Sequence, residues 1–250
     1  MIYIFIALVG ACIGSFLNVV IARLPEKGAF MSDSRSKCPE CGHTIRAYDL
    51  IPIISWLILL GRCRDCKARI SPRYPLVEAS GVFFVLVSLF KFGLAWQALI
   101  VYGVTMILIA VALIDLDTTE IPDSLIIALI PFAIASIWLL PGITWLSHLI
   151  GLVTIALPML LLALVIPGAF GGGDIKLMAV CGLLLGWQLT LLAFFIALVL
   201  GGGVAIYLMA SGKRKRGEHM VFGPALCAGV IATLFFGKEI LVFYTSMFHF

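Results

Sequence analysis

The sequence predicts an all-α polytopic membrane protein with about eight transmembrane helices and a small cytoplasmic insertion. Hydrophobic residues make up 62% of the 250 positions and charged residues only 12%, whereas soluble domains contain about 45–50% apolar and about 25% charged residues. A membrane-spanning helix needs roughly 20 apolar residues. From residue 76 onward most of the chain divides into such runs, separated by Pro, Gly or charged residues.

The distribution of basic residues predicts the orientation of these helices. Ten of the 17 Lys and Arg residues lie between Arg23 and Arg73, and four more form the cluster at 213–216. Loops rich in Lys and Arg remain in the cytoplasm, so we expect both clusters there. The spans that fit are about 1–22, 76–91, 96–114, 124–140, 146–166, 175–187, 188–209 and 220–236. The N-terminus is then outside, and residues 23–75, 115–123, 167–174 and 210–219 face the cytoplasm.

Two apolar segments, the first one and residues 49–61, each allow two interpretations. No basic residue precedes the first apolar segment, so we expect a retained helix rather than a signal peptide. The apolar part of residues 49–61 covers only about 11 residues, and segments of 10–14 residues seldom span a membrane. We therefore expect a core or interfacial segment. The predicted parts are a first helix (1–22), a cytoplasmic four-cysteine domain (23–75) and a transmembrane bundle (76–250).

Two Cys-x2-Cys pairs, separated by 21 residues, predict a metal site within the cytoplasmic part. Their spacing is close to that of zinc ribbons, and four thiolates suit the tetrahedral geometry that Zn²⁺ accepts. Gly42 and Lys67, each directly after a pair, suit the tight turn of such a site. Two disulfides or a redox pair are the alternatives, and a cytoplasmic location disfavours disulfides. We expect a structural zinc ion, because so small a domain has little core of its own. The ligands are Cys38, Cys41, Cys63 and Cys66.

Two groups of carboxylates border predicted spans at the same membrane face. Asp115 closes the third span and is followed by Asp117, Glu120 and Asp123, whereas Asp174 opens the sixth span after three glycines. Ionisable groups in such places are costly and are candidates for function. Each also has a simpler interpretation. Asp117 and Glu120 fit solvated loop charges, Asp123 fits the first turn of a helix, and Asp174 fits a helix N-cap.

The pairing of Asp115 with Asp174 favours chemistry. Two neighbouring carboxylates in a poorly hydrated site share one proton, so one activates water as a base while the other donates to a carbonyl oxygen. This is the chemistry of aspartic proteases. Gly171, Gly172 and Gly173 would let a peptide substrate approach the backbone closely. Lys176 either tunes the pair or extends to the membrane interface, and we expect the second role.

Five motifs in the same order resemble the type IV prepilin peptidases, a family of GxGD-type membrane aspartic proteases that are leader peptidases and N-methyltransferases. The motifs are "GSFLNVVIARLP" (14–25), the two Cys pairs, "SPRYPLVE" (71–78), "IDLDTTEIPD" (114–123) and "FGGGDIKL" (170–177). The resemblance covers nearly the whole chain. It implies that Asp115 and Asp174 are the catalytic pair and that the four cysteines bind zinc.

The resemblance also implies a substrate and a location. The enzyme would cleave the basic leader from type IV prepilins or type II secretion pseudopilins at the cytoplasmic face of the bacterial inner membrane. It would then methylate the new N-terminal residue with S-adenosylmethionine. The chain has no Gly-x-Gly-x-x-Gly motif after a strand, so no cofactor-binding residue is predicted. Membrane lipid is an expected partner, and nucleic acid is not.

Two alternative functions follow from single features of the sequence. Helices interrupted at "GGGD" and "DTTEIPD" are also typical of ion transporters, although those place their carboxylates near the membrane midplane. The Cys pairs alone would also fit a membrane thiol oxidoreductase.

Overall fold

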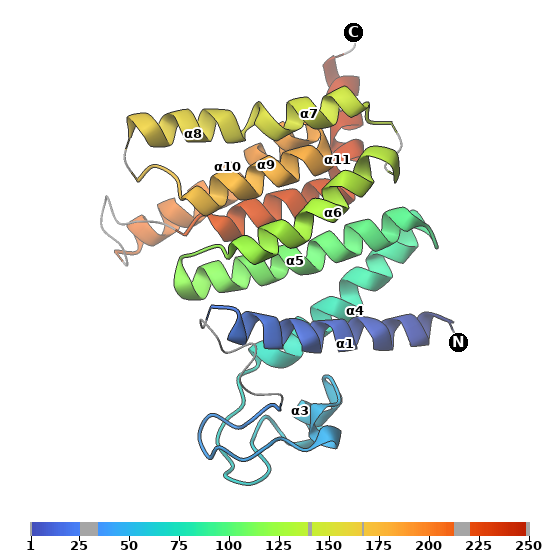
Figure 1. Cartoon of the computed structure of the whole chain (residues 1–250), viewed down its shortest axis with the longest axis vertical. Helices are drawn as coiled ribbons and strands as arrows, with labels where there is room; N and C mark the ends of the chain where they lie inside the picture. Colours follow the sequence, from blue (N-terminus) through green and yellow to red (C-terminus); the bar gives the residue numbers. More distant parts are fainter. Residues whose placement is uncertain (1, 26–34, 140–141, 167, 213–220, 249–250) are drawn as a thin grey trace. The chain divides into compact units, whose positions relative to one another are not determined.

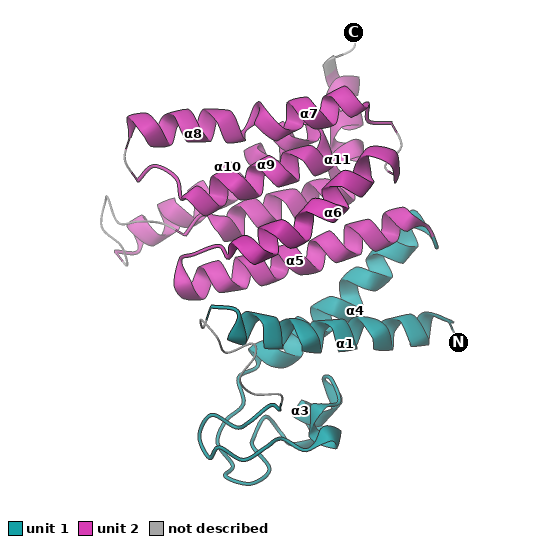
Figure 2. Cartoon of the chain, in the orientation of Figure 1, with its two compact units in different colours: residues 1–94 teal, residues 95–250 magenta. Residues whose placement is uncertain are grey.

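The computed structural model describes residues 2–25, 35–139, 142–166, 168–212 and 221–248. Within these ranges the regular structure is helical, as expected, with two isolated β-bridges in the four-cysteine region. The chain divides into two compact units, residues 1–94 and 95–250, which Figure 2 shows in different colours. The basic cluster at 213–216 lies outside the described residues.

The first unit consists of a helix pair and the four-cysteine domain. Its helices are α1 (Ile2–Arg23), η1 (Ala47–Leu50), α3 (Ile54–Ile58) and α4 (Arg73–Phe92). The backbones of α1 and α4 touch where Gly10 and Gly14 face Gly81, because a Cβ atom at Gly10 would lie 2.7 Å from the Gly81 carbonyl oxygen. Small residues allow this close packing of membrane helices.

The described residues of the second unit form seven helices, which Figure 1 shows arranged in layers. They are α5 (Trp96–Thr118), α6 (Asp123–Leu139), α7 (Trp145–Thr154), α8 (Ala156–Val165), α9 (Gly172–Leu185), α10 (Trp187–Ala210) and α11 (Gly223–Phe248). The short helix α9 is central, because α6, α7, α8, α10 and α11 all contact it. Its side chains Leu177 and Met178 are fully buried.

The predicted spans all coincide with helices, and the fold class is confirmed. Among the described residues, six helical stretches are long and apolar enough to cross a membrane: 2–23, 73–92, 96–118, 145–165 (α7 together with α8), 187–210 and 223–247. The other two predicted spans correspond to α6, with 17 residues, and α9, with 14 residues. The last helix continues well past residue 236, where we expected it to end. Lys238 and Glu239 are exposed, so their charges do not interrupt it.

Polar contacts hold the far end of α9. The Nδ1 atom of the fully buried His148, on α7, lies 2.7 Å from the Leu183 carbonyl oxygen. Since a carbonyl oxygen only accepts, Nδ1 carries the proton and donates. The Ser136 hydroxyl of α6 donates to the neighbouring Leu184 carbonyl oxygen at 3.1 Å. These bonds satisfy carbonyl groups that a helix end leaves without intrahelical partners and fix the position of α9.

The 49–61 segment is not a membrane span. It contains only the short helices η1 and α3. Leu57 and Ile58 of α3 are 58% and 71% exposed. These two side chains are therefore not part of a buried core, whereas Ser55 of the same helix is buried.

Candidate active site and metal cluster

The two Cys pairs form two nearly identical turns. In each turn the N–H of the residue after the second cysteine donates to the carbonyl oxygen of the first: Gly42 to Cys38 at 2.9 Å, and Lys67 to Cys63 at 3.1 Å. Both residues have positive φ angles, 70° for Gly42 and 60° for Lys67. The turn geometry expected from the sequence is therefore present.

The four Sγ atoms lie together as a metal site requires. All are within 4.8 Å of one another, and those of Cys38 and Cys66 are 3.8 Å apart. Zinc–sulfur bonds of about 2.3 Å in a tetrahedron place the sulfurs about 3.8 Å apart. A cluster in which each sulfur neighbours the other three favours one shared metal ion over two separate pairs.

The electrostatics of the cluster also fit a cation. Backbone N–H groups of Cys41 and Glu40 donate to Cys38 and lower its thiol pKa to about 7. The N–H of Ala68 acts in the same direction on Cys66, but loss of water and the three neighbouring sulfurs outweigh it and raise that thiol pKa to about 12. Without a cation the four sulfurs cannot all ionise together, because neighbouring thiolates repel one another. A bound divalent ion offsets this repulsion.

Asp115 lies at the end of α5 and is only 5% exposed. Helix α5 ends at Thr118, and Thr119 then adopts a left-handed conformation while its N–H donates to the Asp115 carbonyl oxygen at 2.8 Å. The Asp115 carboxylate accepts a hydrogen bond from the backbone N–H of Gly223, the first residue of α11. Helix N-termini favour negative charge, so α11 helps to hold this carboxylate.

Asp174 is not the N-cap of its helix, so the simpler interpretation of this residue is wrong in that form. The N-cap of α9 is Gly171, and Asp174 is three residues later. From there its carboxylate accepts a hydrogen bond from the Gly171 backbone N–H. This is the half of a capping box that a residue in the third helical position supplies. Asp174 therefore helps to cap the helix from its third position.

The structure brings the two carboxylates together. Asp174 lies close enough to Asp115 for their charges to interact, and the buried thiol of Cys227 lies near both. Asp115 comes from the end of α5, and Asp174 from the start of α9. Two residues distant in sequence thus share one end of the second unit.

The three glycines before Asp174 have different surroundings. A Cβ atom at Gly173 would lie 2.9 Å from Cβ of Ile121, so the start of α9 packs tightly on the loop between α5 and α6. At Gly172 no atom lies within 4 Å of the same Cβ position. Only Gly172 is therefore fully open on its side-chain face.

Lys176 forms an ion pair that the sequence did not predict. Its Nζ atom donates to both carboxylate oxygens of Asp123 at 2.8 and 3.0 Å. Asp123 is the first residue of α6, so this ion pair ties α6 to α9 beside Ile121 and Gly173. The side chains of Lys176 and Asp123 are 57% and 64% exposed, and such pairs contribute only about 0–1 kcal/mol.

Gly223 is the part of the site that sequence reasoning missed. An added Cβ atom there would collide with Oδ2 of Asp115. The preceding Phe222 contacts the rings of Phe170 and Phe194, with ring centroids 6.1 and 6.4 Å apart. A signal was available, because a Phe-Gly dipeptide lies at the start of both α9 and α11 and Pro224 occupies the first turn of α11.

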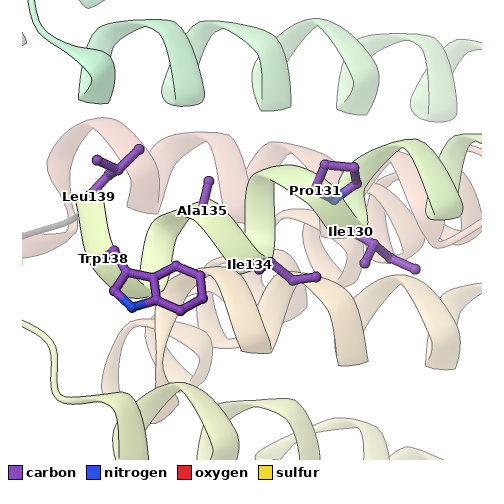
Figure 3. Close-up of a pocket in the computed structure, with 6 residues that line it drawn as sticks. All are labelled: Ile130, Pro131, Ile134, Ala135, Trp138 and Leu139. Carbon is purple, nitrogen blue, oxygen red and sulfur yellow. The ribbon is translucent and has the colours of Figure 1, made fainter.

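The hollow drawn in Figure 3 is separate from these residues. It has a volume of about 540 Å³ and is lined by α6 alone, by Ile130, Pro131, Ile134, Ala135, Trp138 and Leu139. The lining is almost entirely apolar, and Trp138 is 76% exposed. An open apolar surface of this kind suits lipid contact.

Comparison with known proteins places the chain in a family. The model described as "Bacterial Peptidase A24 N-terminal domain" matches residues 8–92, and that of the "Type IV leader peptidase family" matches residues 102–206. A prepilin leader peptidase/N-methyltransferase of Burkholderia pseudomallei (strain 1026b) is 34% identical, over 93% of this chain and 85% of that protein. The chain belongs to the type IV leader peptidase family.

Further relatives agree with this membership. Proteins of the same name from Bacillus subtilis and Pseudomonas putida are 32% and 35% identical, over 95% and 92% of this chain and 96% and 89% of their own lengths. The resemblance seen in the sequence is confirmed. The alternative of an ion transporter has no support from these relatives. No solved structure matches the chain.

Proposed function

We propose that this multi-pass membrane protein is an aspartic endopeptidase that removes the leader from prepilins or pseudopilins. The observation that carries the proposal is the meeting of Asp115 and Asp174 at one end of the second unit. Membership of the leader peptidase family supports it.

Within this proposal the two carboxylates share one proton. The ionised carboxylate takes a proton from a water molecule, which attacks the peptide carbonyl carbon, while the protonated carboxylate donates to the carbonyl oxygen. Backbone N–H groups of Gly223 and Gly171 orient Asp115 and Asp174. The open face of Gly172 leaves room for the substrate backbone.

The four cysteines would hold a structural zinc ion. Their mutual distances fit Zn²⁺, and the region around them, residues 35–72, contains only short helices and isolated β-bridges. A bound ion would therefore provide folding free energy that this small domain lacks. We assign metal binding to residues 23–75 and peptide cleavage to the bundle within residues 76–250.

The second activity in the proposal is methylation of the new N-terminal residue. The names of the relatives support it, with S-adenosylmethionine supplying the methyl group. In the described residues no strand is followed by a glycine-rich turn of the dinucleotide-binding kind, so no residue is assigned to the methyl donor.

We further propose that the protein lies in the bacterial inner membrane with its N-terminus outside. The basic residues between Arg23 and Arg73 support a cytoplasmic location for the four-cysteine domain. The same topology places both carboxylates at the cytoplasmic face.

Mass spectrometry of a co-expressed prepilin tests both activities at once. We expect a new N-terminus at the leader junction and one added methyl group on the new first residue. An intact leader in the presence of a folded, membrane-inserted enzyme would contradict the peptidase. A cleaved but unmethylated product would contradict the methyltransferase alone.

A further inference from the structure

The four-cysteine domain exposes an apolar segment outside the membrane-length helices. Five large aliphatic side chains between residues 51 and 60 are exposed: Ile51 by 48%, Ile54 by 51%, Leu57 by 58%, Ile58 by 71% and Leu60 by 83%. Large exposed apolar side chains that gather in one short segment indicate an interaction site. We call residues 51–60 the apolar segment.

The apolar segment is tied to a membrane helix near the end of that helix. The backbone N–H of Ile53 donates to Oε2 of Glu78 at 2.7 Å, and Glu78 is 91% buried. Helix α4 begins at Arg73, so the Cα atom of Glu78 lies about 7.5 Å along the helix from its first residue. The side chain of a helical residue leans toward the helix N-terminus. Ile53 is therefore held close to the level at which α4 enters the membrane.

Helix α1 ends on the same side as the start of α4. The Asn18 side-chain amide donates to the Tyr74 carbonyl oxygen at 3.0 Å, and α1 ends five residues later at Arg23. Arg23 and Arg73 thus mark the ends of the two paired helices, where basic residues commonly meet lipid headgroups.

The turn at Ile53 is held in an unusual conformation. Its φ and ψ angles are 62° and −52°, and the Ile54 N–H donates to the Pro52 carbonyl oxygen at 2.6 Å. A β-branched residue rarely adopts a positive φ. The bond to Glu78 stabilises this turn, so the apolar segment has a fixed position beside α4.

Basic residues precede and follow the apolar segment in the sequence. Residues 35–73 contain eight Lys or Arg and three Asp or Glu, and five of these basic residues are exposed: Arg46, Arg62, Arg64, Lys67 and Arg69. Asp49 accepts hydrogen bonds from Arg64 and neutralises part of this charge. Exposed apolar residues flanked by cations are characteristic of segments that bind anionic membranes.

We propose that the apolar segment inserts into the headgroup region of a bilayer that contains anionic lipid and docks the four-cysteine domain on the membrane surface. The hydrogen bond to Glu78 holds the apolar segment beside the start of α4. This position and the positive charge of the domain favour lipid over a protein partner. This surface goes beyond both proposed enzymatic activities. The docked domain would hold the cysteine cluster at the membrane surface.

Photo-crosslinking of the full chain tests the proposal. The protein is reconstituted in nanodiscs of phosphatidylcholine with phosphatidylglycerol, with p-benzoylphenylalanine in place of Ile58. The matched control carries it in place of Glu40, an exposed residue of the same domain. We expect lipid adducts with the photo-crosslinker at position 58 and none with it at position 40. Crosslinks from position 58 to a second copy or to residues 95–250 in place of lipid, or equal lipid adducts at both positions, would overturn the proposal.

Two further comparisons test the reasons for docking. Glu78→Ala should reduce the lipid adducts at position 58, whereas Glu78→Gln keeps an oxygen acceptor for the Ile53 N–H and should retain them. Removing phosphatidylglycerol should also reduce the adducts. Unchanged adducts in Glu78→Ala would refute the tether, and unchanged adducts without anionic lipid would refute the charge argument. Gel filtration and thermal unfolding of each variant show whether it is folded.

Discussion

The substitution Gly223→Ala should impair peptide cleavage while leaving the helical fold intact. A Cβ atom at this position would lie 2.9 Å from Cγ of Asp115 and would collide with its Oδ2 atom. Either the carboxylate or the start of α11 must move, and the hydrogen bond from the Gly223 N–H to Asp115 is lost. Hydrogen bonds to charged groups contribute about 1.5–3 kcal/mol. If that stabilisation is needed in the transition state, cleavage slows by about 10- to 150-fold.

The assay compares kcat and KM for cleavage of a purified prepilin by wild-type and variant enzymes in detergent. Gly202→Ala, on α10, is the matched control, because no atom lies within 4 Å of its Cβ position. We expect Gly202→Ala to cleave at the wild-type rate. A wild-type kcat for Gly223→Ala would refute the reasoning. An equal loss in both variants would attribute the effect to helix packing in general.

Three other predictions follow from the site and the metal cluster. Gly173→Ala should lower stability and activity together, because its Cβ would lie 2.9 Å from Ile121. Gly172→Ala, at an open position, should leave thermal unfolding unchanged and raise the KM for the prepilin. An unchanged KM would show that Gly172 does not contact the substrate. Both Lys67 and Gly42 have a positive φ, which glycine adopts more easily than other residues. Lys67→Gly should therefore strengthen the free energy of metal binding, measured by competition with a chelator, by about 1 kcal/mol, and Gly42→Ala should weaken it by about the same amount. Changes of the opposite sign would contradict the turn argument. Metal analysis should find one zinc ion per chain, and its removal should unfold the four-cysteine domain; cysteines that cycle to disulfides in a metal-free protein would instead support a thiol oxidoreductase.

Sequence alone predicted the helices well because membrane spans depend on long apolar runs. The start of α5 and the end of α6 lie within a residue or two of expectation. The end of α11 was placed too early, at residue 236, before the charged residues Lys238 and Glu239. Both side chains are exposed, so the helix continues past them. Hydropathy shows that charged residues are present, but not which face of a helix carries their side chains.

The position of the candidate site could be predicted in part, because Asp115 and Asp174 lie near helix ends. Topology placed Asp115 and Asp174 at one face, and the structure brings them together. The donor to Asp115 was not predictable, since Gly223 contributes only a backbone N–H. The partner of Lys176 was missed for a related reason: Asp123 was interpreted within its own helix, although it also faces a second one.

Asparagine substitution of each carboxylate tests the central claim most directly. Asn has nearly the shape of Asp but can neither take up nor release the shared proton, so Asp115→Asn and Asp174→Asn should each abolish prepilin cleavage in a folded protein. Asp117→Asn, two residues from Asp115 on an exposed side chain, should retain it. Full cleavage by either Asp115→Asn or Asp174→Asn would contradict the aspartic mechanism.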